Sequence, residues 1–228
     1  GMHRSGTSLV AQLVSRWGIN IGDKLIQANE NNPDGFWEYE PLVDFHDKLL
    51  KENANTWYAP INTIDTDQLL EKHEDEARSL VEQMDQGGRD WCWKDPRMPF
   101  FLDFWDQILS ERNVNCVVVY RHPFNVVSSL KKRDNFPVSV SMALWELTSL
   151  YIFNFLSKKN SFIIIDYEKI INTTKEEGGR LFQFLNEAAR ISRKKSLTGD
   201  ILKLVKPSLN HQRLGIHIDI NTFQQRII

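Results

Sequence analysis

Apolar residues along this chain follow two patterns. Three short runs, 91–93, 115–120 and 161–167, are rich in aromatic and β-branched residues. The second and third runs are continuously apolar rather than alternating, which is typical of strands covered on both faces in a parallel sheet. These runs predict three strands.

Between and around these runs, apolar residues recur with a helical period. Strands that alternate with helices predict an α/β fold with three layers and a parallel central sheet. At 228 residues the chain is expected to form one domain over 1–228. We expect a core of about 1–190, then a short helix near 200–205 and an irregular tail over 191–228. The predicted helices of the core are 8–17, 41–51, 67–86, 100–111, 123–132, 138–157 and 175–189.

Composition and charge narrow the class of protein. The 28 basic and 30 acidic residues give a formal charge of −2, which does not indicate nucleic-acid binding. No apolar run in the sequence approaches the length needed to span a bilayer, and the first residues do not resemble a secretory signal. Cys92 and Cys116 lie in apolar runs and are interpreted as buried free thiols. We expect a cytoplasmic protein with neither nucleic acid nor membrane as a partner.

The first eight residues, GMHRSGTS, have the glycine spacing of a phosphate-binding loop and lead directly into an amphipathic helix. Such a loop directs backbone N–H groups and a helix N-terminus at an anion. Thr7 stands where an ATP or GTP site carries lysine, which argues against a nucleoside triphosphatase. Arg4 offers a planar guanidinium to an oxyanion instead. The alternative interpretation is a surface turn in which Ser5 or Thr7 caps the helix.

A second candidate motif follows the predicted strand 115–120. Arg121 stands at the carboxyl end of that strand, where ligands collect in open α/β sheets. Pro123 suits the first turn of the next helix, and Ser129 follows Arg121 by about two helical turns. An arginine and a hydroxyl together can bind a phosphate monoester. Taken alone, Arg121 is equally compatible with a helix-terminus ion pair, and Ser129 with a tolerated small residue.

Together these two segments resemble motifs of the sulfotransferase family that uses 3′-phosphoadenosine-5′-phosphosulfate (PAPS). The first is similar to the family's 5′-phosphosulfate loop, in the G-x-x-R-S-G-T-S form of protein-tyrosine sulfotransferases and bacterial relatives. The second resembles the family's 3′-phosphate motif, an R-x-P after a strand with a serine further along the helix. The resemblance covers roughly 1–186. Weaker pieces that agree with it are Gly35-Phe36-Trp37-Glu38, Trp93-Lys94-Asp95-Pro96-Arg97, Leu144-Trp145 and Asp166-Tyr167-Glu168-Lys169-Ile170-Ile171.

The resemblance implies a P-loop-like fold and transfer of a sulfuryl group from PAPS, as co-substrate, to an acceptor hydroxyl or amine. It implies no metal. The acceptor stays open among small molecules, glycans and peptides, because acceptor pockets are built from variable loops on a shared scaffold. The residues implied to bind PAPS are Arg4, Ser5, Gly6, Thr7, Ser8, Arg121 and Ser129.

Two of the implied catalytic groups are cations. Arg4 is expected to stabilise charge on the departing 5′-phosphate, together with the N–H groups of the loop. Lys94 follows the predicted strand 91–93 and matches the position of a catalytic lysine in cytosolic members of the family. The alternative for Lys94 is an ion pair with Asp95 or another acid.

The third implied catalytic group is a base. Cytosolic members carry a histidine shortly after their lysine, whereas this chain has Asp95 and Pro96 there. Glu38 resembles the glutamate of the tyrosine-sulfotransferase motif, and a carboxylate among aromatic residues has a raised pKa that suits proton transfer. The alternative for Glu38 is an acid at a helix N-terminus. Asp95 and His3 are further candidates for the base.

The tryptophans divide into two groups. Trp37 and Trp57 lie near turn-rich segments and are predicted to line an acceptor cleft. The other four that we consider follow strand or helix periodicity and are predicted to lie in the core. These four are Trp91, Trp93, Trp105 and Trp145.

Two other functions stay open at this point. A P-loop-type nucleotide kinase shares the architecture, and Thr7 argues against it. A non-catalytic relative that binds a nucleotide such as the product 3′-phosphoadenosine-5′-phosphate (PAP) is the other alternative.

The P-loop-like architecture also carries an expectation about the sheet. In that architecture a buried parallel strand precedes the phosphate loop, whereas this sequence begins at the first glycine of the loop. We expect this first strand to be truncated, which would leave backbone groups of strands near Trp93 and Val118 unpaired. The alternating segment 215–220, or a segment exchanged with a second copy in a homodimer, is the candidate to fill the gap.

Overall fold

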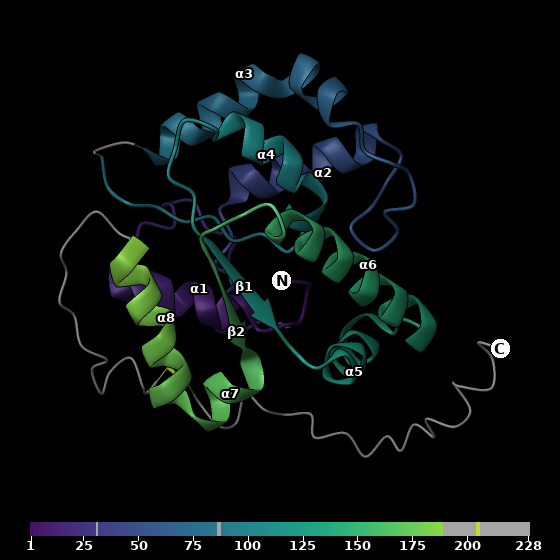
Figure 1. Ribbon diagram of the computed structural model, residues 1–228. Coiled ribbons are helices and arrows are strands. Elements are labelled where there is room, and N and C mark those ends of the chain that lie inside the picture. The colour runs from purple at the N-terminus through teal and green to yellow at the C-terminus, as the bar shows by residue number, and fades with distance from the viewer. Residues whose placement is uncertain (31, 86–87, 189–203, 206–228) are drawn as a thin grey trace.

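The computed structural model describes residues 1–30, 32–85, 88–188 and 204–205, and helices dominate these ranges (Figure 1). Two strands lie in the middle of the molecule, between helices from both halves of the chain. In chain order the elements are α1 (Thr7–Trp17), α2 (Glu40–Glu52), α3 (Thr66–Met84), the 3₁₀ helix η1 (Met98–Phe101), α4 (Leu102–Ile108), β1 (Cys116–Tyr120), α5 (Pro123–Asp134), α6 (Val138–Leu156), β2 (Phe162–Asp166), α7 (Tyr167–Asn172) and α8 (Thr174–Ala188).

The sheet consists of β1 and β2, which pair in parallel with Cys116 opposite Phe162 and Tyr120 opposite Asp166. Successive side chains of β1 point to opposite faces. Val117 and Val119 belong to a cluster with α1, α7 and α8, whereas Val118 packs against the apolar side of α6. Helices therefore contact both faces of β1. The fold is α/β, and its two described strands are too few to establish three layers.

The predicted strand 91–93 is wrong for the described residues. Only an isolated parallel bridge joins Trp91 to Asn20, whose carbonyl accepts the N–H of Cys92 at 2.7 Å. A β-ladder needs several consecutive residue pairs, and here the segment that contains Asn20 diverges from 91–93 after a single pair. Trp91 and Trp93 instead pack on the core as side chains, with their ring centroids 4.8 Å apart.

Helix boundaries follow local capping chemistry. The carboxylate of Asp65 accepts the N–H groups of Asp67 and Gln68 and starts α3. Asp166, the last residue of β2, accepts the N–H of Lys169 and so starts α7 without an intervening loop. The predicted strand 161–167 therefore ends one residue early, and α7 is a helix that the apolar pattern did not indicate. Near Pro99, the predicted helix 100–111 begins as the 3₁₀ helix η1 before it continues as α4.

The apolar interior forms two main clusters. One joins α2, α3, α4 and parts of α5 and α6, and the other joins α1, β1, β2, α7 and α8. Trp105 is buried in the first cluster, and Trp91, Trp93 and Trp145 pack against it. The prediction of a core position is confirmed for Trp105, whereas the other three tryptophans are partly buried at the edge of this cluster.

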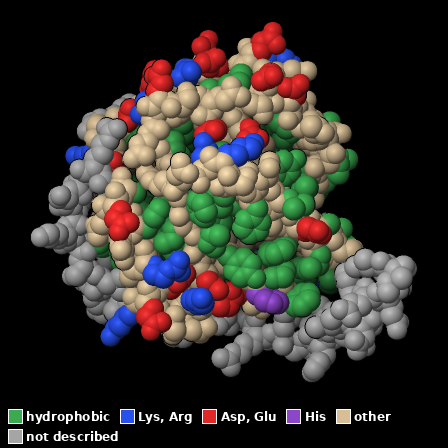
Figure 2. Space-filling model, viewed as in Figure 1, with side chains coloured by type: hydrophobic (Ala, Val, Ile, Leu, Met, Phe, Trp, Pro, Cys, Tyr) green, Lys and Arg blue, Asp and Glu red, His purple; other side chains and the backbone are tan. Residues whose placement is uncertain are grey.

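The two ends of the first cluster present different surfaces. Figure 2 shows charged side chains gathered over α3 and apolar side chains gathered over α6. On α6 the most exposed large apolar residues are Leu150 and Phe153. Among the helices of the described ranges, none combines the length and the apolar character required to cross a membrane.

Several predictions fall beyond the described ranges. Of the expected helix near 200–205, only Leu204 and Val205 are described, and Val205 is buried in the second cluster. The segment 215–220, a candidate to pair with the sheet, lies outside the described residues.

Replacing Ile165 with alanine should lower the free energy of unfolding by about 2–5 kcal/mol, because its side chain is completely buried between β2 and the helices of the second cluster. Ile61 is the matched control: it is 82% exposed, so its replacement should change stability by less than about 0.5 kcal/mol. Urea unfolding of both variants measures the difference. Equal effects would contradict the assigned core.

Candidate functional site

Residues 1–6, which precede α1, form the first loop. A cavity of about 960 Å³ opens where this loop, the segment 32–38 and the residue after β1 meet. Its described lining includes six lysine or arginine side chains against three aspartate or glutamate side chains. A cavity with this excess of positive charge favours an anionic ligand. The basic residues are Arg4, Lys94, Arg97, Arg121, Lys132 and Arg133, and the acidic residues are Glu30, Asp34 and Glu38.

The first loop ends at the uncapped N-terminus of α1. Gly6 occupies the N-cap position with φ 87°, and no side chain caps the helix. The interpretation of Ser5 or Thr7 as a capping residue is therefore wrong. Arg4 is also left-handed, at φ 66°, a strained conformation for a residue other than glycine. The first N–H groups of α1 thus receive no side-chain cap from the described residues, and Gly6, Thr7 and Ser8 line the cavity, an arrangement that suits an anion.

Gly6 is required by packing as well as by its backbone angle. A Cβ atom at this position would lie 2.0 Å from Cδ2 of Tyr167, the first residue of α7. The ring of Tyr167 therefore lies directly against the loop. The guanidinium of Arg121 also lies over the ring of Tyr167, with Cζ of Arg121 4.5 Å from the ring centroid.

The structure brings the two sequence motifs together. Nε of Arg4 donates to Oγ of Ser129 at 2.7 Å, across 125 positions of the chain. Arg121 donates through Nη1 to the carbonyl of Arg4 at 2.9 Å. Glu168 lies 3.6 Å from Nε of Arg121, and this buried Nε has no hydrogen-bond partner among the described residues. The guanidinium of Arg121 is thus fixed between the first loop and Glu168.

Burial lowers the pKa of Arg4, and the charges of Arg133 and Arg121 lower it further. Within the described residues, no carboxylate lies within ion-pair distance of Arg4. A bound anion would relieve this repulsion between neighbouring guanidinium groups.

The two remaining predicted catalytic residues contact each other. Nζ of Lys94 lies 2.5 Å from Oε1 of Glu38 and also donates to the carbonyl of Phe36 at 3.0 Å and to Oγ of Ser8 at 3.3 Å. All three ammonium donors of Lys94 thus have acceptors. The alternative of an ion pair is realised with Glu38 rather than with Asp95. Lys94 thereby joins the segment 32–38 to the first turn of α1.

Burial changes the ionisation of both partners. It raises the pKa of Glu38, and the nearby Lys94 opposes this rise. It lowers the pKa of Lys94, and the nearby Glu38 opposes this fall. Burial therefore favours the neutral form of each group, whereas their contact favours the charged forms. The carboxylate of Glu38 forms the ion pair with Lys94. The acid in the first turn of α2 is Glu40, so Glu38 does not have the alternative role of an acid at the helix N-terminus.

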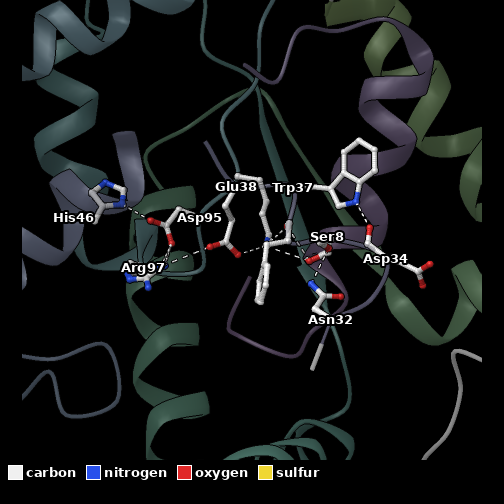
Figure 3. A network of polar contacts seen from close by, with 11 residues as sticks. Ser8, Asn32, Asp34, Trp37, Glu38, His46, Asp95 and Arg97 are labelled. Carbon is white, nitrogen blue, oxygen red and sulfur yellow. Dashed lines mark hydrogen bonds and ion pairs between the residues drawn. The ribbon is translucent and has the colours of Figure 1, made fainter. Parts of the chain in front are cut away.

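The segment that carries Glu38 is held in a strained shape (Figure 3). Gly35 has φ 87° and Trp37 has φ 58°. Nδ2 of Asn32 donates to the carbonyl of Gly35, and Nε1 of Trp37 donates to the carbonyl of Asp34, both at 2.7 Å. These bonds stabilise a backbone that isolated residues would rarely adopt.

The two other candidates for the base differ in access. His3 lines the cavity and contacts Trp57, with ring centroids 4.2 Å apart and the ring planes tilted by 36°. Burial and then the charge of Arg97 hold the pKa of His3 well below its ordinary value, so its imidazole is neutral at pH 7. The side chain of Asp95 is completely buried and is bound by Arg97 and by a histidine of α2.

Most of the predicted site residues therefore face one cavity. Ser5 is buried, and neither Ser5 nor Asp95 is among the described lining residues. Trp37 and Trp57 both line the cavity, as the prediction of an acceptor cleft requires.

Several lining residues were missed as parts of the site, among them Tyr167, Arg97 and Arg133. Tyr167 and Arg97 lie within segments that resemble the family, and Arg133 lies at the end of α5, with its Cζ 5.7 Å from the centroid of the Trp57 ring. The available signal for Tyr167 was its position immediately after a strand that is parallel to β1.

The described residues contain no group of three or more His, Cys, Asp or Glu side chains placed to hold a metal ion. Compared with models of protein families, with curated proteins and with solved structures, the chain matches none of them. Any family assignment therefore depends on the motifs and on the site geometry alone.

Lys94→Met and Glu38→Gln should each destabilise the protein, and the double variant should be less destabilised than the two effects added together. The reason is that each single change removes one charge of a buried ion pair and leaves the other charge without it. We expect a coupling of about 0.5–3 kcal/mol in urea unfolding at pH 7.

The matched control is the exposed pair Lys48 and Glu76, whose Nζ and Oε2 atoms are 2.6 Å apart with side chains 42% and 48% exposed. The same substitutions at Lys48 and Glu76 should couple by less than about 1 kcal/mol. Strict additivity at Lys94 and Glu38 would contradict the buried ion pair.

Proposed function

We propose that this protein transfers a sulfuryl group from PAPS to a hydroxyl or amine of a small-molecule, glycan or peptide acceptor. The observation that carries this proposal is the convergence of Arg4, Ser129 and Arg121, through contacts of 2.7 and 2.9 Å, beside the uncapped start of α1. Two anion-binding devices from distant parts of the chain thus meet in one basic cavity.

In this proposal the two phosphate-bearing ends of PAPS bind different parts of the cavity. The 5′-phosphosulfate lies against the loop, where Arg4 and the N–H groups at the start of α1 supply donors. The 3′-phosphate lies near Arg121 and Ser129. The guanidinium of Arg121 supports the fit, because it lines the cavity beside Arg4 and its planar set of donors suits a phosphate group.

The proposed reaction requires the protein to align donor and acceptor, to stabilise the charge on the leaving phosphate and to supply a base. The acceptor oxygen or nitrogen forms a bond to sulfur while the bond between sulfur and the 5′-phosphate oxygen breaks, which releases PAP. Arg4 and Lys94 stabilise the charge on the departing phosphate. Glu38 takes the proton of the acceptor, and its burial favours the protonated form. Because Lys94 contacts both Glu38 and Ser8, it connects the proposed base to the phosphate loop.

A P-loop-like fold with three layers belongs to the same proposal. The parallel pairing of β1 with β2 and the helices on both faces of β1 support it. We also propose a cytoplasmic location, supported by the two free thiols Cys92 and Cys116.

A second candidate function is binding of PAP without transfer. It is favoured by the complete engagement of the Lys94 ammonium with acceptors of the protein itself. Transfer of labelled sulfate distinguishes the two functions.

The protein should bind PAP more tightly than AMP, which lacks the 3′-phosphate, and more tightly than ATP. One charge-assisted hydrogen bond to phosphate contributes about 1.5–3 kcal/mol, so Arg121→Ala should remove roughly a tenfold to hundredfold preference for PAP. Isothermal calorimetry with the three nucleotides measures it.

Arg112→Ala is the control for this measurement, because Arg112 is paired with Asp85 on the surface and is not among the lining residues. Equal affinity for PAP and AMP would refute the proposed 3′-phosphate site. A preference for ATP would favour a nucleotide kinase.

Glu38→Gln should lower the rate of sulfuryl transfer by about a hundredfold or more while PAP affinity stays nearly unchanged, since the amide cannot accept the proton. The measurement is transfer of labelled sulfate from PAPS into a cell extract, with mass spectrometry of the labelled products. Glu76→Gln, on the surface of α3, is the control.

Full activity of Glu38→Gln together with loss of activity in His3→Gln would assign the base to His3 instead. Absence of transfer by the unaltered protein, with PAP binding intact, would favour the non-catalytic alternative.

A further inference from the structure

A row of buried polar groups leads from the buried side of α2 toward the cavity (Figure 3). It begins at His46, whose side chain is completely buried. Nε1 of Trp105 donates to Nε2 of His46 at 2.8 Å, so Nε2 is an acceptor and the ring proton resides on Nδ1. That Nδ1 lies 2.7 Å from Oδ2 of Asp95, to which it donates. The tautomer of His46 is thus fixed from both sides.

The other oxygen of Asp95 holds Arg97. Oδ1 of Asp95 accepts the backbone N–H of Arg97 at 2.9 Å and its Nη1 at 3.0 Å. Nε of Arg97 donates to Oδ1 of Asp47 at 2.6 Å. Two carboxylates therefore fix the plane of this guanidinium, and its side chain is only 12% exposed. Because both Asp95 and His46 are buried, this arrangement has little freedom to rearrange.

Arg97 in turn faces the second oxygen of Glu38. Nη1 of Arg97 lies 3.7 Å from Oε2 of Glu38, while Lys94 binds Oε1. Figure 3 shows Arg97 between Asp95 and Glu38, with contacts to both. Glu38 therefore lies between two cations, and each of its oxygens has a separate partner. This two-sided contact restricts rotation of the carboxylate.

The charged groups around Glu38 act in opposite directions. Burial raises its pKa, Lys94 and Arg97 lower it, and the charge of Asp95 raises it. For Asp95, burial alone would raise the pKa, but the hydrogen bond from His46, the charge of Arg97 and the backbone N–H of Arg97 hold it well below its ordinary value. Asp95 therefore stays ionised at neutral pH and keeps its hydrogen bonds to Arg97.

We infer that Arg97 is a positioning residue for Glu38, and that Asp95 and His46 act through Arg97 to hold it in place. This inference deepens the function proposed above, since it gives the base of that reaction its orientation and its ionised resting form. Asp95 thereby has a role that needs no access to the acceptor. Arg97, for its part, places a positive charge beside the carboxylate that must be ionised before it can accept a proton.

The first test is a pH titration of the Glu38 carboxyl carbon by NMR in the full-length protein, with the signal assigned through Glu38→Gln. Arg97→Gln removes a positive charge beside Glu38, so the titration should move to higher pH. Arg97→Lys keeps the charge and should move it less. Arg112→Gln, which removes an arginine from a surface pair, should leave it unchanged. An unchanged titration in a folded Arg97→Gln variant would overturn the inference.

The second test addresses Asp95 and His46. The Nη1–H protons of Arg97, which face Asp95, should exchange slowly with water in the unaltered protein and at least about tenfold faster in Asp95→Asn, because a charge-assisted hydrogen bond is lost. Trp105→Phe removes the donor to His46 together with part of a buried ring, leaves Asp95 and Arg97 in place, and should also accelerate exchange, which covers the case in which Asp95→Asn fails to fold. Asp85→Asn, beside Arg112, is the control.

Unchanged exchange in folded Asp95→Asn and Trp105→Phe variants would show that Arg97 is held without them, and that part of the inference would fall. Both tests measure ionisation and exchange rather than turnover. They therefore separate a failure of this inference from a failure of sulfuryl transfer, which the labelled-sulfate experiment detects.

Discussion

The parallel register of β1 and β2 determines where the chemistry of this protein gathers. Because Tyr120 lies opposite Asp166, the chain leaves both strands at the same edge, and the next residues are Arg121 and Tyr167. The guanidinium of Arg121 then stacks on the ring of Tyr167, and that ring lies against Gly6 of the loop. One strand pairing thus brings together three segments that are far apart in the sequence.

A second constraint is the cost of burying charge. The cavity concentrates arginine and lysine side chains, and burial lowers the pKa of Arg4 and of Lys94. The protein offsets this cost on one side of the cavity with the carboxylates of Glu38 and Asp95. Beside Arg4 and Arg121 the compensation is weaker: among the residues that the structure describes, the carboxylate within ion-pair distance is that of Glu168, 3.6 Å from Arg121. The uncompensated side is the one that we assign to phosphate groups.

The sequence was informative where a feature depends on neighbouring residues. The glycine spacing placed the loop before α1, and the continuous apolar runs identified β1 and β2. It was less informative where geometry depends on residues far apart. The contact between Lys94 and Glu38 spans 56 positions, and no local pattern couples them. The prediction of a strand at 91–93 was wrong for a related reason: strand pairing depends on a neighbouring segment, and that segment diverges after Asn20. By contrast, the start of α7 was open to prediction, because Asp166 is a strong capping residue.

The contact between Gly6 and Tyr167 means that positions 6 and 167 cannot vary independently. Any side chain at position 6 would collide with the ring, and displacing the ring would remove the surface on which Arg121 rests. A smaller residue at position 167 would make room for a β-carbon, but φ 87° at position 6 would still disfavour every residue except glycine. The two positions form a single steric unit, so a pair of compensating substitutions would relieve the clash without relieving the backbone strain.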